Sequence, residues 1–304
     1  MNLDLQNQIK KLCIEAGFYK AGFFNIEKLE AEGKNYENWL KEKRNADMFW
    51  MEKNQEKRVN PGIIMEGAKS VISLAFIYDT PFEHSSEKNI AKISRYAWGE
   101  IDYHKFLKKK LKFLCKEIEK LEDGIKTKFY VDDGPVLEKA IAVRAGIGWQ
   151  GKNSNVIIPE AGSYFFLCEI FINRELQTSV RIDDMCGNCN ICVAACPTGA
   201  IYEDYKVDAN LCISYHTIEN RGEIPEYINL DNWIFGCDIC QEVCPYNNHS
   251  LFTEEKSFYP IQLIFNKTFD ELSKINEEEF NELFKSSPVK RTKFSGWKRN
   301  LNHN

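Results

Sequence analysis

Residues 186–197 read Cys-Gly-Asn-Cys-Asn-Ile-Cys-Val-Ala-Ala-Cys-Pro, which places thiols at positions 186, 189, 192 and 196. Two spacers of two residues, one of three and a closing proline form the pattern Cys-x2-Cys-x2-Cys-x3-Cys-Pro, which binds iron–sulfur clusters. The first three thiolates wrap one cluster, whereas the fourth, ahead of the proline, binds a second one. The run therefore requires a partner motif elsewhere in the chain.

A matching motif lies downstream, where Cys212 precedes the run Cys237-x2-Cys240-x3-Cys244-Pro245. In bacterial two-cluster ferredoxins, the last cysteine of each run binds the cluster that the other run holds. Applied here, this rule divides the eight thiolates into two sets of four. Two [4Fe–4S] clusters indicate transfer of single electrons to another group in the chain or in a partner. The predicted ligands are Cys186, Cys189, Cys192 and Cys244 for the first cluster, and Cys196, Cys212, Cys237 and Cys240 for the second.

Two structural zinc sites are the alternative explanation for spaced cysteines. Zinc accounts for the Cys-x2-Cys spacing, but not for a third cysteine two residues further on or for two separate Cys-Pro endings. The spacing therefore favours iron–sulfur clusters. The other three of the 11 cysteines, Cys13, Cys115 and Cys168, lie in apolar patterns, where cysteine behaves as a small buried hydrophobic residue.

Composition indicates a globular protein, because 43% of the 304 residues are hydrophobic and 28% are charged. No stretch approaches the roughly 18 consecutive apolar residues of a membrane span. The start, Met1-Asn-Leu-Asp, lacks the basic and apolar segments of a secretion signal. We therefore expect a cytoplasmic protein without membrane contact, in which thiols stay reduced. The net charge of −5 does not predict a polyanionic partner, although basic residues gather in residues 105–128 and 285–299.

Helical and strand patterns are mixed without regular alternation over residues 1–175, which predicts an α+β domain with a mixed sheet. A cluster domain over 176–250 and a helical segment with a basic tail over 251–304 follow. The predicted helices cover residues 5–16, 36–53, 103–121 and 135–145, and the predicted strands cover 70–78, 126–131, 155–158 and 164–172.

The run Gly146-Ile-Gly-Trp-Gln-Gly151 fits the dinucleotide pattern G-x-G-x-x-G, but that site needs a strand before it and a helix after it. Here a predicted helix precedes and a strand-like run follows, so we reject a Rossmann site. Glycines used for tight packing, or for the close approach of a bulky ligand, fit this context better.

Two acids, Asp132 and Asp133, join a predicted strand to a predicted helix. The pattern favours helix capping by one of them. Since one cap suffices, the other carboxyl would be left at a strand end, a position suited to general acid chemistry. Arg95 to Trp98 and Asp102 to His104 mix aromatic and charged groups, which indicates packing beside a solvated edge.

Several further motifs stand together in the chain. They are Ser94-Arg-Tyr-Ala-Trp-Gly99, Asp102-Tyr-His-Lys105, Val131-Asp-Asp-Gly-Pro-Val-Leu-Glu138, Arg144-Ala-Gly-Ile-Gly-Trp-Gln-Gly-Lys-Asn153, Cys212-Ile-Ser-Tyr215, Gly236-Cys-Asp-Ile-Cys-Gln241, Ser287-Pro-Val-Lys-Arg291 and Trp297-Lys-Arg-Asn-Leu301. With the two cysteine runs, they make the chain from about residue 5 to its end resemble the epoxyqueuosine reductases, cobalamin-dependent iron–sulfur enzymes of tRNA queuosine modification.

The resemblance implies a cobalamin-binding catalytic domain over residues 1–175 and reduction of epoxyqueuosine to queuosine at the wobble position of tRNA. Cob(II)alamin would be reduced to cob(I)alamin through the two clusters, fed by an unidentified low-potential electron donor, and the protein would act as a monomer. Asp132 would be the proton donor. The implied cobalamin contacts are Arg58, Ala97, Asp132, Val156, Ile158, Leu167 and Ser214.

Two departures from the family pattern affect these expectations. Asp133 stands where the family usually has Ser or Thr, and the HEAT-like repeats that help many members to grip tRNA are missing from this sequence. RNA would then be held by the basic tail, through phosphate contacts or a stacked base; the alternative is a tail that only solubilises. The candidates are Lys290, Arg291, Lys293, Lys298 and Arg299, with Trp297 as a stacking or packing residue.

Two rival functions stay open at this point. One is a reductive dehalogenase-like enzyme, which would use the same cofactors on a small halogenated molecule. The other is an electron-carrier subunit, in which residues 1–175 only dock a partner protein.

Overall fold

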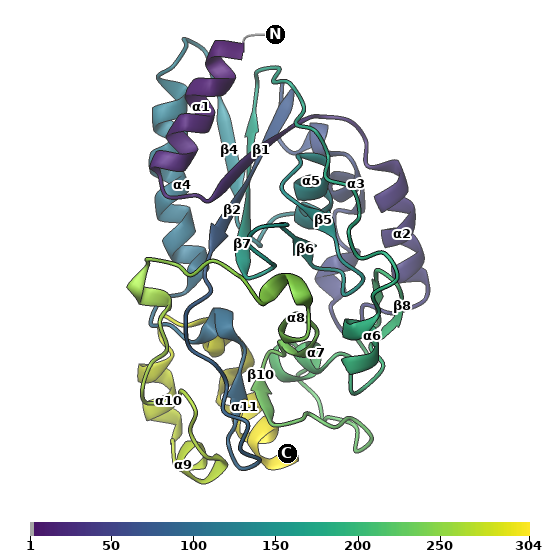
Figure 1. Ribbon diagram of the computed structural model, residues 1–304, viewed down its shortest axis with the longest axis vertical. Helices are drawn as coiled ribbons and strands as arrows, with labels where there is room; N and C mark the ends of the chain where they lie inside the picture. The colour runs from purple at the N-terminus through teal and green to yellow at the C-terminus, as the bar shows by residue number, and fades with distance from the viewer. Residues whose placement is uncertain (1–2) are drawn as a thin grey trace.

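A four-stranded antiparallel sheet forms the centre of the computed structural model, which describes residues 3–304 (Figure 1). The strand order is β1-β2-β7-β4, and every neighbouring pair is antiparallel. The strands are β1 (Lys20–Asn25), β2 (Ser70–Ile77), β4 (Thr127–Tyr130) and β7 (Phe165–Ile172). The two long central strands, β2 and β7, read as continuous apolar runs because helices cover both of their faces.

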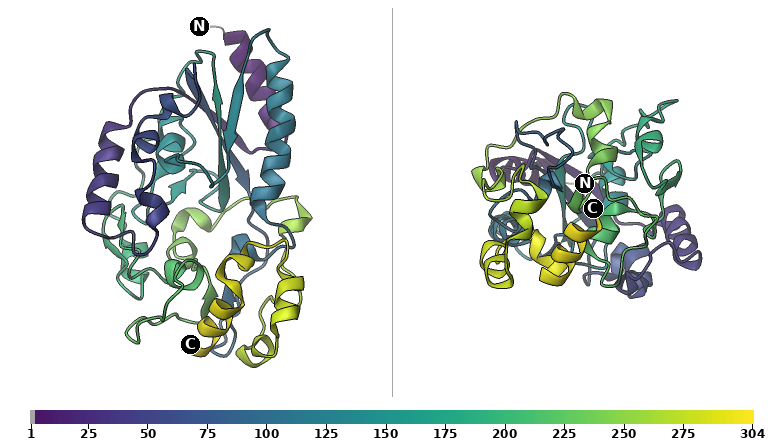
Figure 2. Two further views of the ribbon diagram at one scale, coloured as in Figure 1. Left: turned by 180° about the vertical axis from the view of Figure 1, so that it is seen from behind. Right: turned by 90° about the horizontal axis from the view of Figure 1, so that it is seen from below.

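One face of the sheet is covered by α1 (Leu3–Glu15) and α4 (Tyr103–Glu119), which lie together in both side views (Figures 1 and 2). Ile72 and Leu74 of β2 point to this face, where they join Ile9 and Leu107 in the largest apolar cluster. The opposite face is covered by α5 (Glu138–Arg144). Side chains alternate along a strand, so Ser73 of β2 points towards α5.

Short helices and strand pairs extend the structure around the sheet. The helices on the α5 side are α2 (Glu30–Lys41), η1 (Phe49–Glu52), α3 (Gln55–Val59) and η2 (Pro61–Ile63). The short strand pairs are β5 (Trp149–Gln150) with β6 (Val156–Ile157), β8 (Ile201–Glu203) with β9 (Lys206–Val207), and the parallel pair β3 (Lys92–Ile93) with β10 (Trp233–Phe235).

The cysteine-rich segment and the C-terminal helices lie at the end of the long axis opposite α1 (Figure 1). The two cysteine runs carry α6 (Ile191–Ala195) and α8 (Ile239–Glu242), and α7 (Ile213–Ile218) begins directly after Cys212. Capping boxes at Thr268 and Asn276 start two of the late helices. The remaining elements are η3 (Arg95–Ala97), η4 (Pro245–Asn247), η5 (Lys256–Phe258), α9 (Phe269–Ser273), α10 (Glu277–Leu283), η6 (Pro288–Thr292) and α11 (Lys293–His303).

Most of the predicted elements are present, but two predictions need correction and one strand was not predicted. The helix predicted over 36–53 ends at Lys41, because Lys43 and Ala46 adopt left-handed backbone angles that a helix cannot continue. The sequence analysis did not identify β1. The main sheet is antiparallel rather than mixed, and a separate parallel pair forms between β3 and β10.

Other predictions are confirmed. The glycine run follows α5 and contains β5, so it lacks the strand–turn–helix context of a dinucleotide site. A side chain at Gly148 would meet the carbonyl oxygen of Ile157, which accounts for the glycine by tight packing. Cys13, Cys115 and Cys168 are buried as small apolar residues. Across residues 3–304, the helices are too short or too polar to cross a bilayer.

Candidate active site

A cavity of about 1970 Å³ lies where residues of the sheet domain meet the cysteine-rich segment and the C-terminal helices. Pockets for drug-sized ligands measure about 300–1,000 Å³, so this cavity suits a much larger group. Its wall is discontinuous in sequence. The lining comes from residues between 32 and 58, 96 and 105, 132 and 140, 202 and 219, and 285 and 291, together with Gln150 and Ser154.

Asp132 follows β4 and points its carboxylate into the cavity, where the side chain is 63% exposed. Its backbone is left-handed, with φ of 53°, a conformation that only surrounding contacts stabilise in a residue other than glycine. The Tyr103 hydroxyl donates to Asp132 Oδ2 at 2.5 Å, and the Asp132 backbone N–H donates to Glu138 Oε1 at 2.7 Å.

His104 lies between two carboxylates. Its Nδ1 is 2.8 Å from Asp102 Oδ1, and its Nε2 is 3.7 Å from Asp132 Oδ2. Burial alone would lower the pKa of His104, but the hydrogen bonds and negative charges of Asp102 and Asp132 raise it to about 9. The imidazole is therefore protonated at neutral pH and stores a proton beside Asp132.

The pKa of Asp132 moves the other way. Burial would raise it, but the close approach of His104, the hydrogen bond from Tyr103 and the positive charges of His104 and Lys139 outweigh burial and lower it. Asp132 at rest is thus a carboxylate paired with an imidazolium. For Asp132 to act as an acid, a neighbouring group must supply its proton.

Asp133 is turned towards a cation. Its Oδ2 pairs with Lys108 Nζ, and its Oδ1 accepts a hydrogen bond from the Val131 backbone N–H at 3.2 Å. The Lys108 charge offsets the extra negative charge beside Asp132. The capping prediction is wrong, because α5 starts after Leu137 without a side-chain cap from either aspartate.

The motif thiols lie close enough to one another to affect each other's pKa, and their division into two ligand sets stays a prediction. Burial raises the pKa of Cys192, and the nearby Cys244, Cys186 and Cys189 add to that shift. Burial likewise raises the pKa of Cys237, with Cys212 and Cys240 close enough to contribute, and Cys196 acts in the same way on Cys212. All of these thiols are free of disulfides.

The second set borders the cavity. Cys212 is part of its lining, and none of the four cysteines of the first set belongs to the lining residues of the described chain. Lys139 lies between Asp132 and this second set, because the charges of Cys240, Asp132 and Cys212 all act on its amine. Its Nζ donates to the Ser154 carbonyl at 3.1 Å and to Asn155 Oδ1 at 3.0 Å.

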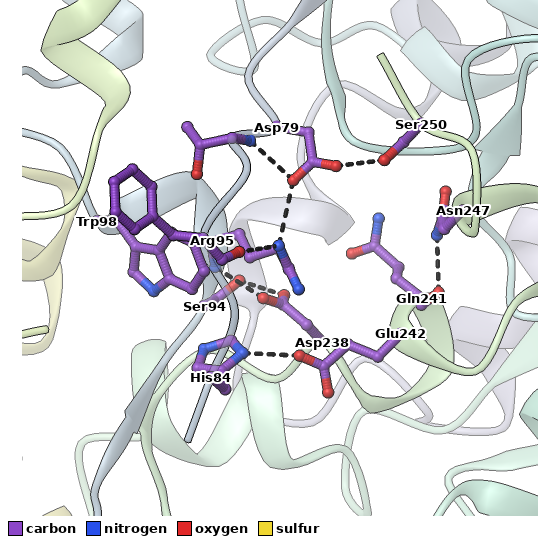
Figure 3. Close-up of polar contacts among 12 residues, drawn as sticks. Asp79, His84, Ser94, Arg95, Trp98, Asp238, Gln241, Glu242, Asn247 and Ser250 are labelled. Atoms are coloured by element: carbon purple, nitrogen blue, oxygen red, sulfur yellow. Dashed lines mark hydrogen bonds and ion pairs between the residues drawn. The ribbon is translucent and has the colours of Figure 1, made fainter. Parts of the chain in front are cut away.

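The loop between Cys237 and Cys240 is tied to the first half of the chain through the buried Asp238 (Figure 3). Asp238 accepts a hydrogen bond from the Ser94 hydroxyl and another from the Arg95 backbone N–H at 2.7 Å. Figure 3 also shows His84 Nδ1 meeting Glu242 Oε1, at 2.7 Å. Because β3 pairs with β10 beside these contacts, the second cysteine set is fixed relative to the sheet domain.

The implied cofactor contacts divide into two groups. Arg58, Asp132 and Ser214 line the cavity. Ala97, Val156, Ile158 and Leu167 are absent from its lining; they lie in apolar clusters or pack against them. The structure thus brings three of the seven residues to one cavity and gives no support for the other four.

The basic C-terminal segment packs against the rest of the protein and is not only a solubilising tail. Lys290 and Arg291 line the cavity, and the Arg291 guanidinium is 2.8 Å from Glu219 and 5.3 Å from the centre of the Trp50 ring. Trp297 is 0% exposed, so the stacking prediction is wrong and the packing alternative is confirmed. The Arg299 guanidinium donates to the His216, Asn220 and Gly222 carbonyls, which removes it from phosphate binding.

Sequence reasoning did not assign Tyr103, His104, Lys139, Glu138 and Glu169 to the site. Tyr103 and His104 were interpreted as packing beside a solvated edge. The signal that could have identified Glu169 is its position, because it is the one acid in the apolar run 164–172.

Comparisons with known families agree with the cysteine motifs. Residues 185–247 match a family model described as a 4Fe-4S double cluster binding domain. Residues 58–133 match a model described as epoxyqueuosine reductase QueG, DUF1730.

Individual relatives match along the whole chain. The chain is 42% identical to an epoxyqueuosine reductase of Leadbetterella byssophila, over 98% of this chain and 97% of the relative. It is also 42% identical to one of Atelocyanobacterium thalassa, over 99% of each. A crystal structure of epoxyqueuosine reductase with an epoxyqueuosine-modified tRNA-Tyr stem loop is similar with a TM-score of 0.90 at 30% identity, over 100% of this chain and 81% of that one. A Bacillus subtilis epoxyqueuosine reductase has the same TM-score at 29% identity and the same coverage, and its catalytic aspartate loop is swung out of the active site.

Proposed function

Because the chain belongs to the epoxyqueuosine reductase family, we infer that it is an oxidoreductase that reduces epoxyqueuosine to queuosine in tRNA. One observation carries the assignment of the active site to the large cavity. Asp132, with Tyr103 and His104 bound to it, lines the same cavity as Cys212 of the second cysteine set. The cavity thus combines a proton source with a route for electrons.

The reduction of an epoxide to an alkene needs both protons and electrons. Removal of the epoxide oxygen to leave an alkene breaks two C–O bonds, consumes two electrons and two protons, and releases water. Iron–sulfur clusters transfer electrons one at a time. The oxygen has to be protonated as it leaves carbon, because an alkoxide is a poor product at neutral pH.

We assign the proton transfer to Asp132. Its Oδ2 accepts a hydrogen bond from the Tyr103 hydroxyl and lies beside the His104 imidazolium. The Asp132 carboxylate thus faces the cavity, with two proton-bearing side chains next to it. Asp132 would protonate the opened oxygen and be reprotonated from that side. In the Bacillus subtilis relative, the catalytic loop that bears an aspartate is swung out of the active site.

Cobalamin is the cofactor that we propose for the cavity. The volume of about 1970 Å³ suits a macrocycle, and the wall offers polar groups for its amide side chains. Arg58, Lys139 and Ser214 are the lining residues suited to hold it. When bound, cobalamin supplies a strongly nucleophilic, reducible metal centre that the protein lacks.

The electron route follows from the placement of the two cysteine sets. The second set borders the cavity through Cys212, so its cluster would be the immediate donor to the active site. The first set lies on a surface segment, where Met185 and Ile191 are about half exposed. A low-potential donor would deliver electrons there.

The tRNA would approach the side of the cavity formed by Lys285, Lys290 and Arg291, which line it from the C-terminal segment. Phosphate contacts from such residues position RNA, and an unstacked base can enter a pocket that a helix cannot. One structural neighbour holds a modified tRNA stem loop. A cytoplasmic location suits this substrate.

The two rival functions are not favoured. Full-length similarity at 42% identity is to epoxyqueuosine reductases. An electron-carrier subunit would need no acid in a cavity large enough for a cofactor.

Anaerobic reconstitution with iron, sulfide and cobalamin, followed by assay on tRNA containing epoxyqueuosine, tests the proposal. We expect queuosine as the product, bound cobalamin in the purified protein, and loss of turnover in Asp132→Asn with cobalamin retained. Asp133→Asn is the matched control, because Asp133 pairs with Lys108, and it should keep turnover. Full turnover in Asp132→Asn would refute the role of Asp132, and absence of queuosine with loaded wild-type protein would refute the function.

A further inference from the structure

Glu169 is an acid in the middle of a buried strand. It lies on β7, is 0% exposed and points to the face of the sheet that α5 covers. Its Oε1 accepts a hydrogen bond from the Ser73 hydroxyl at 3.3 Å. Its Oε2 is buried and has no hydrogen-bond donor among residues 3–304. An isolated carboxylate at such a position is costly, so the group requires another explanation.

The neighbour of Glu169 is a second carboxyl. Glu138, in the first turn of α5, interacts with Glu169 side chain to side chain. Two carboxylates are both acceptors and cannot bond to each other, but a carboxylic acid donates to a carboxylate. One proton shared between Glu138 and Glu169 would give the orphaned Oε2 its partner and reduce the negative charge of the pair from two to one.

The groups around the pair do not supply a counter-charge to both acids. Glu169 faces Ser73 of β2, and Cys168 beside it points to the opposite face of the sheet. The titratable groups close enough to act on the pair are Asp132, Tyr103, Cys168 and Lys139. Lys139 is the cation among these groups, and its amine donates to the Ser154 carbonyl and to Asn155. Burial, together with the neighbouring negative charges, raises the pKa of Glu138 well above its ordinary value and that of Glu169 to about 8.

The pair is connected to the proposed acid. Glu138 Oε1 accepts the Asp132 backbone N–H at 2.7 Å, and both side chains line the same cavity. The proposed reaction consumes two protons in each turnover, whereas the Asp132 carboxyl carries one at a time. A second proton has to reach Asp132 between the opening of the epoxide and the loss of water.

We propose that Glu138 and Glu169 share one proton at neutral pH and pass it to Asp132 during turnover. This inference rests on the proposed function. In the transfer, the O–H bond of the Glu138 carboxyl breaks and an O–H bond forms on the Asp132 carboxylate, directly or through one cavity water. The pair is left with two negative charges and regains a proton from solvent in the cavity. Both glutamates act through Asp132 and are positioning residues for its proton.

Infrared spectroscopy of the holoenzyme tests the shared proton without turnover. We expect the carbonyl stretch of a carboxylic acid at about pH 6.5, its shift in D2O, and its loss as pH rises through about 8. Glu169→Gln should remove the band. Asp132→Asn and the exposed Glu160→Gln should keep it. Absence of the band in the wild-type protein, or its persistence in Glu169→Gln, would overturn the proposal.

Kinetics test the transfer itself. Glu169→Gln should lower kcat roughly tenfold at neutral pH, less than the about 10²- to 10⁴-fold effect of losing a direct general acid. The KM for tRNA, the iron content and the cobalamin content should stay unchanged. The wild-type kcat should fall as pH rises through about 8, and the variant should lose this dependence. An unchanged pH profile in Glu169→Gln would overturn the transfer, whereas a wild-type holoenzyme without turnover would instead refute the proposed function.

Discussion

Tyr103 donates its phenolic proton to Asp132 Oδ2 at 2.5 Å, although the two residues come from different elements of the sheet domain. Tyr103 begins α4, and Asp132 follows β4. The ring of Tyr103 is stacked on Phe166 of β7 at 4.2 Å between centroids, so packing fixes the direction of the hydroxyl. The orientation of the proposed acid therefore depends on the core of the sheet domain.

Removal of that hydroxyl tests the relationship. Tyr103→Phe keeps the ring and its stacking, and we expect a loss of about 0.5–1.5 kcal/mol in the free energy of unfolding at most. Turnover should fall about tenfold, since Asp132 loses one of the two donors that hold its Oδ2. Steady-state kinetics on modified tRNA measure the effect, with the exposed Tyr227→Phe as control. Equal turnover in Tyr103→Phe and wild-type protein would contradict the positioning role.

His104 should make stability depend on pH. Burial opposes the shift, but Asp102 and Asp132 raise its pKa from 6.5 to about 9, so the folded protein holds a proton that the unfolded chain releases. The contribution to stability is fully present below about pH 6.5 and is lost as pH rises through about 9. Because solvent screens these groups in part, we expect about 1–2 kcal/mol.

The measurement is the unfolding midpoint of wild-type protein and His104→Gln at about pH 6 and about pH 10. The wild-type midpoint should drop more between the two conditions. A drop of equal size in His104→Gln would show that the imidazolium does not supply the stabilisation.

The buried acid pair predicts a second pH dependence. Burial raises the pKa of Glu169 from 4.5 to about 8, so its proton stabilises the folded state below about pH 4.5 and this contribution disappears as pH rises through about 8. At about 1.4 kcal/mol for each pKa unit, the effect is on the order of a few kcal/mol. Urea unfolding across this range should show a steeper loss of stability in wild-type protein than in Glu169→Gln. Parallel curves would contradict a proton bound at this site.

The assignment of cysteines to clusters predicts selective loss of iron. Cys212→Ser should release the second cluster and leave about half of the iron and sulfide, because the first set does not include this residue. Cys115→Ala is the matched control, since Cys115 is a buried thiol outside both sets. Iron and sulfide analysis after anaerobic reconstitution checks both variants. Full iron content in Cys212→Ser would contradict the assignment.

Two basic residues of the C-terminal segment should respond differently to substitution. Lys290→Gln should weaken tRNA binding and reduce the slope of log K against log salt by about one, as expected for a lost phosphate contact. Arg299→Gln should instead lower the free energy of unfolding, because the Arg299 guanidinium donates hydrogen bonds to three backbone carbonyls. Filter binding at several salt concentrations and thermal unfolding distinguish the two. An unaltered salt slope in Lys290→Gln would argue against its contact with RNA.

The sequence contains strong local signals for part of this structure. Cysteine spacing predicts a double-cluster domain because each cysteine run is a short local motif, and residues 185–247 match a family model of that kind. The strand within the apolar run 164–172 and the helix at 103–119 can also be predicted, because the spacing of apolar residues in each segment matches the face that it buries. β1 was missed, since its residues 20–25 include a glycine and have no alternation. Its partner β2 is what makes it a strand.

The site itself was harder to predict, because its residues meet only after folding. Asp132 could be named from a motif, but its dependence on Tyr103, His104 and Glu138 arises from packing between α4, β4 and α5. The residues that line the cavity were hard to predict for the same reason. Arg58 and Ser214 reach it from segments far apart in sequence, whereas Ala97, although part of a motif, lies outside its lining.

The attachment of Asp238 to Ser94 and Arg95 has a consequence for damage by air. Asp238 lies between Cys237 and Cys240, the proposed ligands of the second cluster, and Ser94 and Arg95 precede Tyr96, which lines the cavity. Oxidative breakdown of that cluster would free the loop and, with it, the adjoining wall of the active site. Oxygen would therefore deform the pocket as well as interrupt its supply of reducing equivalents. An artificial reductant added to enzyme that has lost this cluster would not restore activity until the cluster had been reconstituted with iron and sulfide.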